Sequence, residues 1–190
     1  MTRPALLLAL CGLLSSFLVW MVLDHNHARN SGTEIILDME PVDPRSLFRG
    51  HFVIIRTPLH DLNLTNLEGD DDFEDGDRVY VTLAQNPNGD WLPVSTNKTK
   101  PDSTQTFLQG RVENLSVFSA RTGDEYPLID HRGLDVQYKI ESYFADKASA
   151  KALERKVREA KMRVILSVTK DGQAVIRGIE INGERHLDKL

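Results

Sequence analysis

The residues that most directly suggest chemistry are the acids between Glu68 and Asp77, where seven carboxylates fall within ten positions. Calcium is bound by about six to eight oxygen ligands, so this segment is a candidate cation site. An EF-hand loop needs carboxylates at alternating positions ahead of its glycine. With Gly76 as that glycine, Phe73 takes the middle position and Thr82 takes the last, where a glutamate is required. We therefore favour a solvated acidic loop and expect no metal ligand here.

Two further patterns are weaker. His25 and His27 form a His-x-His pair whose rings would point the same way in an extended segment and could share a metal, but no further ligand is near in sequence. A polar tether explains the pair better. Cys11 is the single cysteine, so no intrachain disulfide can form. The sequence indicates no cofactor.

Nucleophilic catalysis has little support in the sequence. No Gly-x-Ser-x-Gly elbow occurs. An anchored β domain in which Arg49-Gly50 leads into a strand is similar to type I signal peptidases, which use a serine activated by a deprotonated lysine. Here Ser46 lies only four residues before Gly50, and no lysine precedes Lys98. A hydrolase with a site near Arg45, His51 and Glu141 stays open as the alternative function.

The N-terminal region predicts a membrane anchor. Residues Ala5–Leu23 carry no charge and would span about 28 Å as a helix, close to the ~30 Å hydrocarbon core of a bilayer. A cleaved signal peptide has a shorter apolar region and small residues at its cleavage site, whereas this run ends in Val-Trp-Met-Val-Leu. Arg3 before the run favours a cytoplasmic N-terminus, although Arg29 beyond it weakens the contrast.

These features predict four regions. They are a cytoplasmic N-terminus (1–4), a transmembrane anchor (5–23), a juxtamembrane linker (24–33) and an extracytoplasmic β-rich domain (34–190). A chain of 190 residues suits one domain with a short appendage. The net charge of -5 gives no reason to expect a nucleic acid partner.

Strand patterns dominate the rest of the chain. Apolar and polar residues alternate in "EIILDME", "VYVTLA" and "LDVQYKIESYF", as in half-buried strands. "HFVII" is apolar on both faces and is expected to lie centrally in a sheet. Asn88-Gly89 and Asp171-Gly172 predict tight hairpin turns. One helix is expected after Asp146, over "KASAKALERKVREAKM". The fold class is therefore mainly β, a sandwich or barrel with one late helix, behind the transmembrane helix.

The stretch "PVDPRSLFRGHFVIIRT", Pro41–Thr57, combines a turn with an apolar strand. Asp43-Pro44 favours a turn, and Gly50 could supply a positive φ or a bulge before the strand. This stretch resembles the signature of the GDYXXLXY family, small bacterial proteins that are commonly membrane-anchored. The similarity continues in Asp77–Val94, in "LQGRV" (Leu108–Val112) and in "YKIESYFAD" (Tyr138–Asp146), and so covers most of the chain beyond the apolar run.

The match to the motif that names the family is partial. Gly50 is kept, while His51 replaces the aspartate, Phe52 the first tyrosine, Ile55 the leucine and Thr57 the last tyrosine. A structural role for the motif tolerates the loss of the aspartate better than a catalytic one does. Enzymatic activity is therefore left uncertain, and the exchange leans against it.

The resemblance singles out five positions: Asp43, Arg45, Gly50, Glu141 and Tyr143. Arg45 is expected to pair with Glu141 and to hold the turn against the late strand. The resemblance also implies a polytopic membrane protein as partner, because relatives are often associated with such proteins. The expected function is a binding or assembly module, held by a single-pass anchor on the periplasmic face of a bacterial inner membrane.

Overall fold

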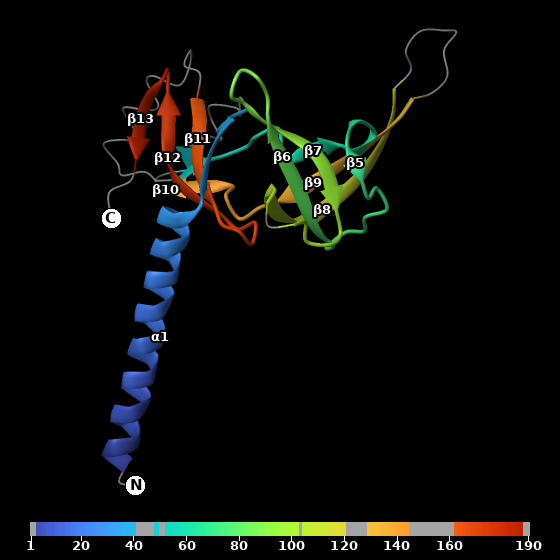
Figure 1. Ribbon diagram of the computed structural model, residues 1–190. Helices are drawn as coiled ribbons and strands as arrows, with labels where there is room; N and C mark the ends of the chain where they lie inside the picture. Colours follow the sequence, from blue (N-terminus) through green and yellow to red (C-terminus); the bar gives the residue numbers. More distant parts are fainter. Residues whose placement is uncertain are drawn as a thin grey trace.

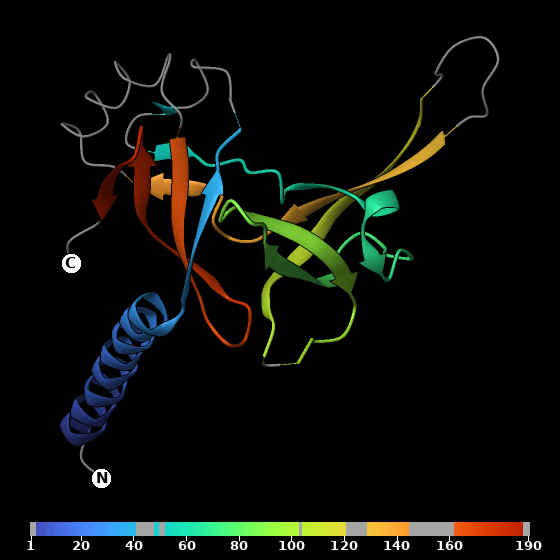
Figure 2. The ribbon, with the colours of Figure 1, turned by 45° about the horizontal axis from the view of Figure 1, so that its top comes forward.

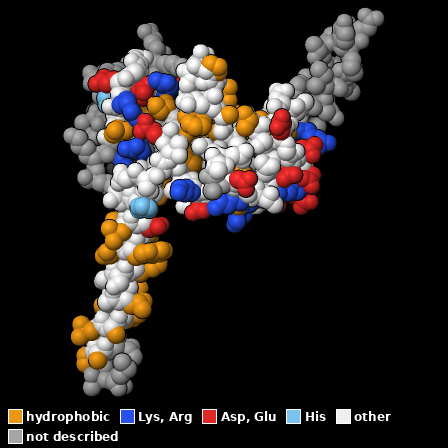
Figure 3. Space-filling view, in the orientation of Figure 1, with side chains coloured by type: hydrophobic (Ala, Val, Ile, Leu, Met, Phe, Trp, Pro, Cys, Tyr) orange, Lys and Arg blue, Asp and Glu red, His pale blue; other side chains and the backbone are white. Residues whose placement is uncertain are grey.

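The computed structural model describes residues 3–40, 48–49, 52–102, 104–120, 129–144 and 162–187. The chain begins with a long helix, α1 (Arg3–Ser31), that stands away from a β-rich body (Figure 1). Within it, Leu7–Ser31 is long and apolar enough to cross a membrane, and its most apolar window is not buried at all. Figure 3 shows hydrophobic side chains along α1, whereas charged side chains of both signs cover the body.

The helix continues through the residues expected to be a linker. Positions 24–31 are helical, and only Gly32 separates α1 from the first strand. His25 and His27 are therefore about 200° apart around the helix axis, so their rings do not share a side. The reason is local: no proline or glycine interrupts the run between Leu23 and Ser31, so nothing stops the helix there.

The helix leads directly into a four-stranded antiparallel sheet. It contains β1 (Thr33–Asp38), β11 (Met162–Val168), β12 (Ala174–Ile181) and β13 (Glu184–Leu187), in the order β1-β11-β12-β13. The turn at Asp171-Gly172, predicted from sequence, joins β11 to β12, and Gly172 has φ +78°. We call this sheet the helix sheet.

A six-stranded sheet forms the other half of the body. Its strands are β4 (Asp61–Asn63), β5 (Glu68–Gly69), β6 (Arg78–Gln85), β7 (Trp91–Asn97), β8 (Thr106–Ala120) and β9 (Ile129–Gln137). The order is β4-β9-β8-β6-β7-β5, and a short 3-10 helix, η1 (Leu64–Asn66), follows β4. The ends of β8 and β9 run beyond the other strands as a two-stranded arm (Figures 1 and 2).

A small third sheet pairs two distant segments. It contains β2 (Phe48–Arg49), β3 (Phe52–Ile54) and β10 (Ser142–Phe144), in the order β10-β3-β2. The apolar strand of "HFVII" is central here, as its sequence predicts. Figure 2 shows this small sheet beside the helix sheet.

One hydrophobic core joins the two larger sheets. The helix sheet contributes Ile35, Leu37, Val164, Leu166 and Val168, and the six-stranded sheet contributes Val79, Val81, Leu83, Leu108, Val112, Leu134 and Val136. Side chains two apart on each strand point to the same face, so the alternation in the sequence produces this core directly. The mainly β fold behind one N-terminal apolar helix is confirmed, and the expected helix after Asp146 lies outside the described residues.

One expected strand is wrong. The alternation from Leu134 to Phe144 predicts a single strand, but β9 ends at Gln137 and β10 begins at Ser142 in a different sheet. Lys139 breaks the strand because its backbone has φ +64°, in the left-handed region. The break transfers the chain from the six-stranded sheet to the small sheet.

Candidate functional site

The first and last motifs meet in the small sheet. Val53 lies opposite Tyr143, and Phe52 lies opposite Phe144, in the antiparallel pair of β3 and β10. The amide of Ile55 then donates to the carbonyl of Glu141 at 2.9 Å. Segments about 90 residues apart in sequence are thus held together by backbone hydrogen bonds, whatever their side chains are.

The middle motif contributes Gly110 of β8. A Cβ at this position would lie 2.3 Å from Cγ1 of Val136 and 3.0 Å from the ring of Tyr138. Such contacts are too short for any side chain, so only glycine lets the Tyr138 ring lie against the strand. The glycine of "LQGRV" and the tyrosine of "YKIESYFAD" therefore fit together directly.

Glu141 holds the turn between β9 and β10. Its Oε1 accepts the amide of Tyr138 at 2.6 Å and the amide of Lys139 at 3.0 Å. These bonds fall where Lys139 has φ +64°, a conformation that is unfavourable for a residue with a Cβ. The carboxylate satisfies two backbone amides that β pairing has released, and so it stabilises the strained turn.

Tyr138 connects this turn to the core. Its hydroxyl donates to the carbonyl of Leu59 at 2.9 Å, and its ring meets the ring of His60 edge to face with centroids 5.5 Å apart. Burial, and to a lesser extent the charge of Glu141, raises the pKa of Tyr138 above its usual range. The phenol therefore acts as a neutral hydrogen-bond donor at physiological pH.

His60 and Thr57 form a buried local pair beneath this turn. Nδ1 of His60 accepts the amide of Thr57 at 3.1 Å and lies 3.1 Å from the Thr57 hydroxyl oxygen. Nδ1 also lies 3.2 Å from the carbonyl oxygen of Thr57, whereas Nε2 makes no hydrogen bond to the described residues and lies 3.9 Å from Oε1 of Glu141.

The order hydroxyl, imidazole, carboxylate invites comparison with a catalytic triad. However, Thr57 is 1% exposed and His60 is 5% exposed, so no substrate can reach the hydroxyl without local opening. The imidazole nitrogen next to the hydroxyl is also occupied by the Thr57 amide. This geometry suits a packed turn that supports Tyr138 and Glu141 better than it suits a nucleophile.

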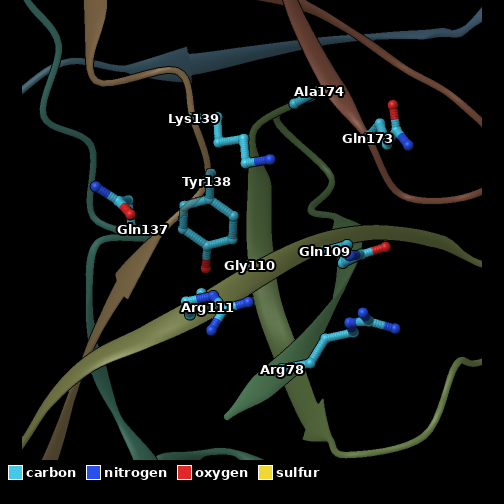
Figure 4. Close-up of a pocket in the computed structure, with 9 residues that line it drawn as sticks. All are labelled: Arg78, Gln109, Gly110, Arg111, Gln137, Tyr138, Lys139, Gln173 and Ala174. Carbon is cyan, nitrogen blue, oxygen red and sulfur yellow. The ribbon is translucent and has the colours of Figure 1, made fainter. Parts of the chain in front are cut away.

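An open pocket lies beside the Tyr138–Lys139 turn (Figure 4). Its volume is about 300 Å³, and it is lined by Arg78, Gln109, Gly110, Arg111, Gln137, Tyr138, Lys139, Gln173 and Ala174. The lining thus comes from β6, β8, the end of β9 with the turn that follows it, and the β11–β12 hairpin. It contains three cations, three amide side chains and no acid.

Strand register explains why two of these cations are neighbours. Arg78 lies directly opposite Arg111 in the β6–β8 pair, and Arg111 lies opposite Gln137 in the β8–β9 pair. Residues directly opposite one another point to the same face, so the two arginines share the outer face of the sheet. The β11–β12 hairpin is fixed beside them, because the amide of Gln109 donates to the carbonyl of Gly172 at 2.7 Å.

The acidic segment is folded around a lysine. Nζ of Lys98 lies 3.1 Å from a carboxylate oxygen of Asp72 and 3.9 Å from one of Asp77, while the Lys98 amide donates to Asp70 at 2.7 Å. Hydrogen bonding to Lys98 lowers the pKa of Asp72. Phe73 is buried beneath the lysine.

A second ion pair involves the same acidic segment: Arg132 pairs with Asp71 at 3.0 Å. Among the described residues, no three His, Cys, Asp or Glu side chains are grouped to hold a metal ion.

Of the five predicted site residues, two lie in described segments. Glu141 is at the turn, and Tyr143 is in β10, where its backbone pairs with Val53. Asp43, Arg45 and Gly50 lie outside the described residues. The Arg45–Glu141 pair therefore stays a prediction, as does the alternative site with His51, which also lies outside the described residues.

Sequence reasoning missed most of the residues that surround Glu141. The alternation in the sequence places Tyr138 on the apolar face of a strand and Lys139 on the polar face. His60, Arg78 and Arg111 gave no signal, because each is a single residue without a motif of its own. The one signal in the sequence is that Arg111 lies within the motif "LQGRV" and Lys139 within the motif "YKIESYFAD".

Fold and site together define a β-rich body, carried on an N-terminal apolar helix, whose motifs converge on one turn beside a basic pocket. The chain belongs to the GDYXXLXY protein family, whose model matches residues 14–179 and so includes all of these motifs. Comparison with curated proteins and with solved structures finds no match.

Proposed function

We propose that this protein is a single-pass protein of the bacterial inner membrane, whose β body stands on the periplasmic side as a binding or assembly module. The observation that carries the proposal is the surface of α1, whose large apolar side chains from Leu7 to Leu23 are exposed. A helix that is apolar all round and has no protein partner fits a lipid environment. The predicted regions 1–4, 5–23, 24–33 and 34–190 are retained in this proposal, with positions 24–31 of the third one helical.

The junction between helix and body supports a positioning role. The carbonyl of Ala28 accepts the hydroxyl of Ser167 at 2.8 Å, and a guanidinium nitrogen of Arg29 donates to the carbonyl of Arg177 at 3.2 Å. A Cβ on Gly32 would lie 2.3 Å from Oγ of Ser167, so the chain passes close to β11 there. The helix is therefore docked on the sheet, and a module joined in this way presents a fixed face to its surroundings.

The height of the body above the membrane follows from the helix. Positions 24–31 rise about 12 Å at about 1.5 Å per residue, which is beyond the headgroup layer of a bilayer. At this height the body is within reach of a partner that is itself held in the membrane. A polytopic membrane protein meets that condition, because its helices could contact α1 while its loops contact the body.

The orientation is supported by the placement of the two flanking arginines. Arg3 precedes the apolar run, whereas Arg29 is buried against the body and occupied by its contacts there. Arg3 comes before the apolar run in the sequence, and an excess of positive charge favours the cytoplasmic side.

Topology is tested with one introduced thiol. In a Cys11→Ser background, Asn88→Cys places a single cysteine in the exposed β6–β7 turn. We expect a membrane-impermeant maleimide to label it in spheroplasts as fully as after lysis. Labelling that requires lysis would place the body in the cytosol and would overturn the proposed side.

The partner is tested by affinity purification of the full chain in a mild detergent. We expect a polytopic membrane protein in stoichiometric amount. Recovery of the protein alone from membranes treated with a cross-linker would contradict the assembly role. The release of a body without its helix from intact cells would contradict the anchor as well.

A further inference from the structure

The cations of the body divide into two groups. Seven have a carboxylate oxygen within 4.0 Å: Arg56, Lys98, Lys100, Arg132, Arg163, Arg177 and Arg185. In the described part of the chain, Arg78, Arg111, Lys139 and Lys170 have no carboxylate partner, and the first three of them line the same pocket. A guanidinium nitrogen of Arg111 donates to the carbonyl of Gly76 at 3.1 Å, a contact that leaves its charge unneutralised. In a protein of net charge -5, three unneutralised cations in one place are a specific feature of the fold.

The arrangement of these cations works against stability. Arg78 and Arg111 are directly opposite each other on adjacent strands, where like charges repel. Lys139 occupies a left-handed conformation with φ +64°, which is unfavourable for a residue with a Cβ. Strained backbone is often found at binding sites, and a ligand of opposite charge would relieve the repulsion between the two arginines.

The chemistry of the lining indicates the class of ligand. Guanidinium groups bind oxyanions through paired N–H donors, and an ammonium group adds a compact charge. The side-chain amides of Gln109, Gln137 and Gln173 add further donors around the same space. A volume of about 300 Å³ admits a phosphate group with a small substituent and is at the lower end for ligand pockets.

We propose that Arg78, Arg111 and Lys139 form a binding site for a phosphate-bearing ligand at the junction of the two larger sheets. Three positive charges match a phosphate monoester, which carries up to two negative charges at neutral pH. Glu141 does not oppose this, because its Oε1 is directed to the amides of Tyr138 and Lys139 and it is not part of the lining. Glu141 instead fixes the backbone from which Lys139 extends.

This inference does not depend on the proposed membrane partner. It requires only the pocket of the folded body. Failure to bind phosphate would leave the anchor and the partner untouched, and failure to find a partner would leave the pocket untouched.

The test uses the full chain in maltoside micelles, which contain no phosphate. Inorganic phosphate and glycerol 3-phosphate are titrated against potassium chloride at matched ionic strength, with binding followed by calorimetry. We expect saturable binding that is at least tenfold weaker in Arg78→Gln and in Lys139→Gln. Arg185→Gln removes the same charge from β13, outside the pocket, and should bind as the wild type does.

A second arm separates the two sources of phosphate. Phosphatidylglycerol is added to the micelles and its competition with glycerol 3-phosphate is measured. Competition in the wild-type protein identifies a lipid headgroup as ligand, and its absence identifies a soluble phosphorylated compound. Binding that is equal in Arg78→Gln and Arg185→Gln, or no saturable binding above the chloride control, overturns the site.

Discussion

The carboxylate of Glu141 accepts the backbone amide of Lys139 at 3.0 Å, within a turn where Lys139 has φ +64°. This one contact links the family motif to the pocket. The turn places Lys139 in the lining of the pocket and packs the Tyr138 ring against Gly110 and His60. Glu141 is thus a positioning residue, which explains how a motif residue outside the pocket can determine its shape.

Replacing Glu141 by alanine should destabilise the body. Two amides at the turn would lose their acceptor, and unsatisfied groups of this kind cost about 1–3 kcal/mol each when buried. Glu141→Gln keeps one carbonyl acceptor and should lose less. Chemical unfolding of the full chain in maltoside, followed by near-ultraviolet circular dichroism, measures both. Glu113→Ala, an exposed carboxylate on β8, is the control, and an equal effect there would contradict the role of Glu141.

Replacing Lys139 by glycine should separate stability from binding. Glycine adopts φ +64° without a Cβ clash. We therefore expect the free energy of unfolding to rise by about 0.5–1 kcal/mol, a net value that includes the entropy that glycine adds to the unfolded chain. The same variant lacks a pocket cation and should bind phosphate more weakly. Lys170→Gly, in the β11–β12 turn and without a positive φ, should lose about 0.5–1 kcal/mol because glycine adds entropy to the unfolded chain, and it should bind phosphate as the wild type does. A destabilised Lys139→Gly would show that the lysine side chain itself holds the turn.

Tyr138 should make the body sensitive to alkaline pH. Its pKa is raised in the folded state, so its contribution to stability is fully present below the unfolded value of about 10 and is lost as the pH rises above it. Tyr138→Phe should lower the free energy of unfolding by about 1 kcal/mol at neutral pH, because the carbonyl of Leu59 loses its donor. The variant should also lose stability less steeply above about pH 10. Parallel alkaline slopes for the two proteins would contradict this account.

Gly32 should be required for the helix to dock. A methyl group there would meet Oγ of Ser167 at 2.3 Å and the backbone oxygen of Val168 at 2.7 Å. We expect Gly32→Ala to cost about 1–3 kcal/mol, as overpacked sites do, and to speed tryptic cleavage after Arg29. Gly12→Ala, where nothing lies within 4 Å of the added carbon, is the matched control. Unchanged cleavage in Gly32→Ala would show that the helix is not held at this point.

The sequence alone determined those features that depend on residues close together along the chain. An uncharged run of sufficient length predicted α1 as a possible membrane span, and alternation of apolar and polar residues predicted the buried faces of β1, β6 and β9. Glycines in Asn88-Gly89 and Asp171-Gly172 predicted turns because each needs a positive φ, and both have one, +90° and +78°. These are local signals, so they do not depend on which distant segments of the chain the strands and turns contact.

Only the tertiary structure decided where the strand from Leu134 would break and what would gather around the break. Alternation continues through Lys139, and the turn forms there because the carboxylate of Glu141 folds back onto two amides and Gly110 leaves room for Tyr138. The pocket combines Arg78, Arg111, Lys139 and Gln173 from four segments, each ordinary in its own sequence context. Their proximity follows from strand register and from the docking of one hairpin, and no spacing along the chain encodes either.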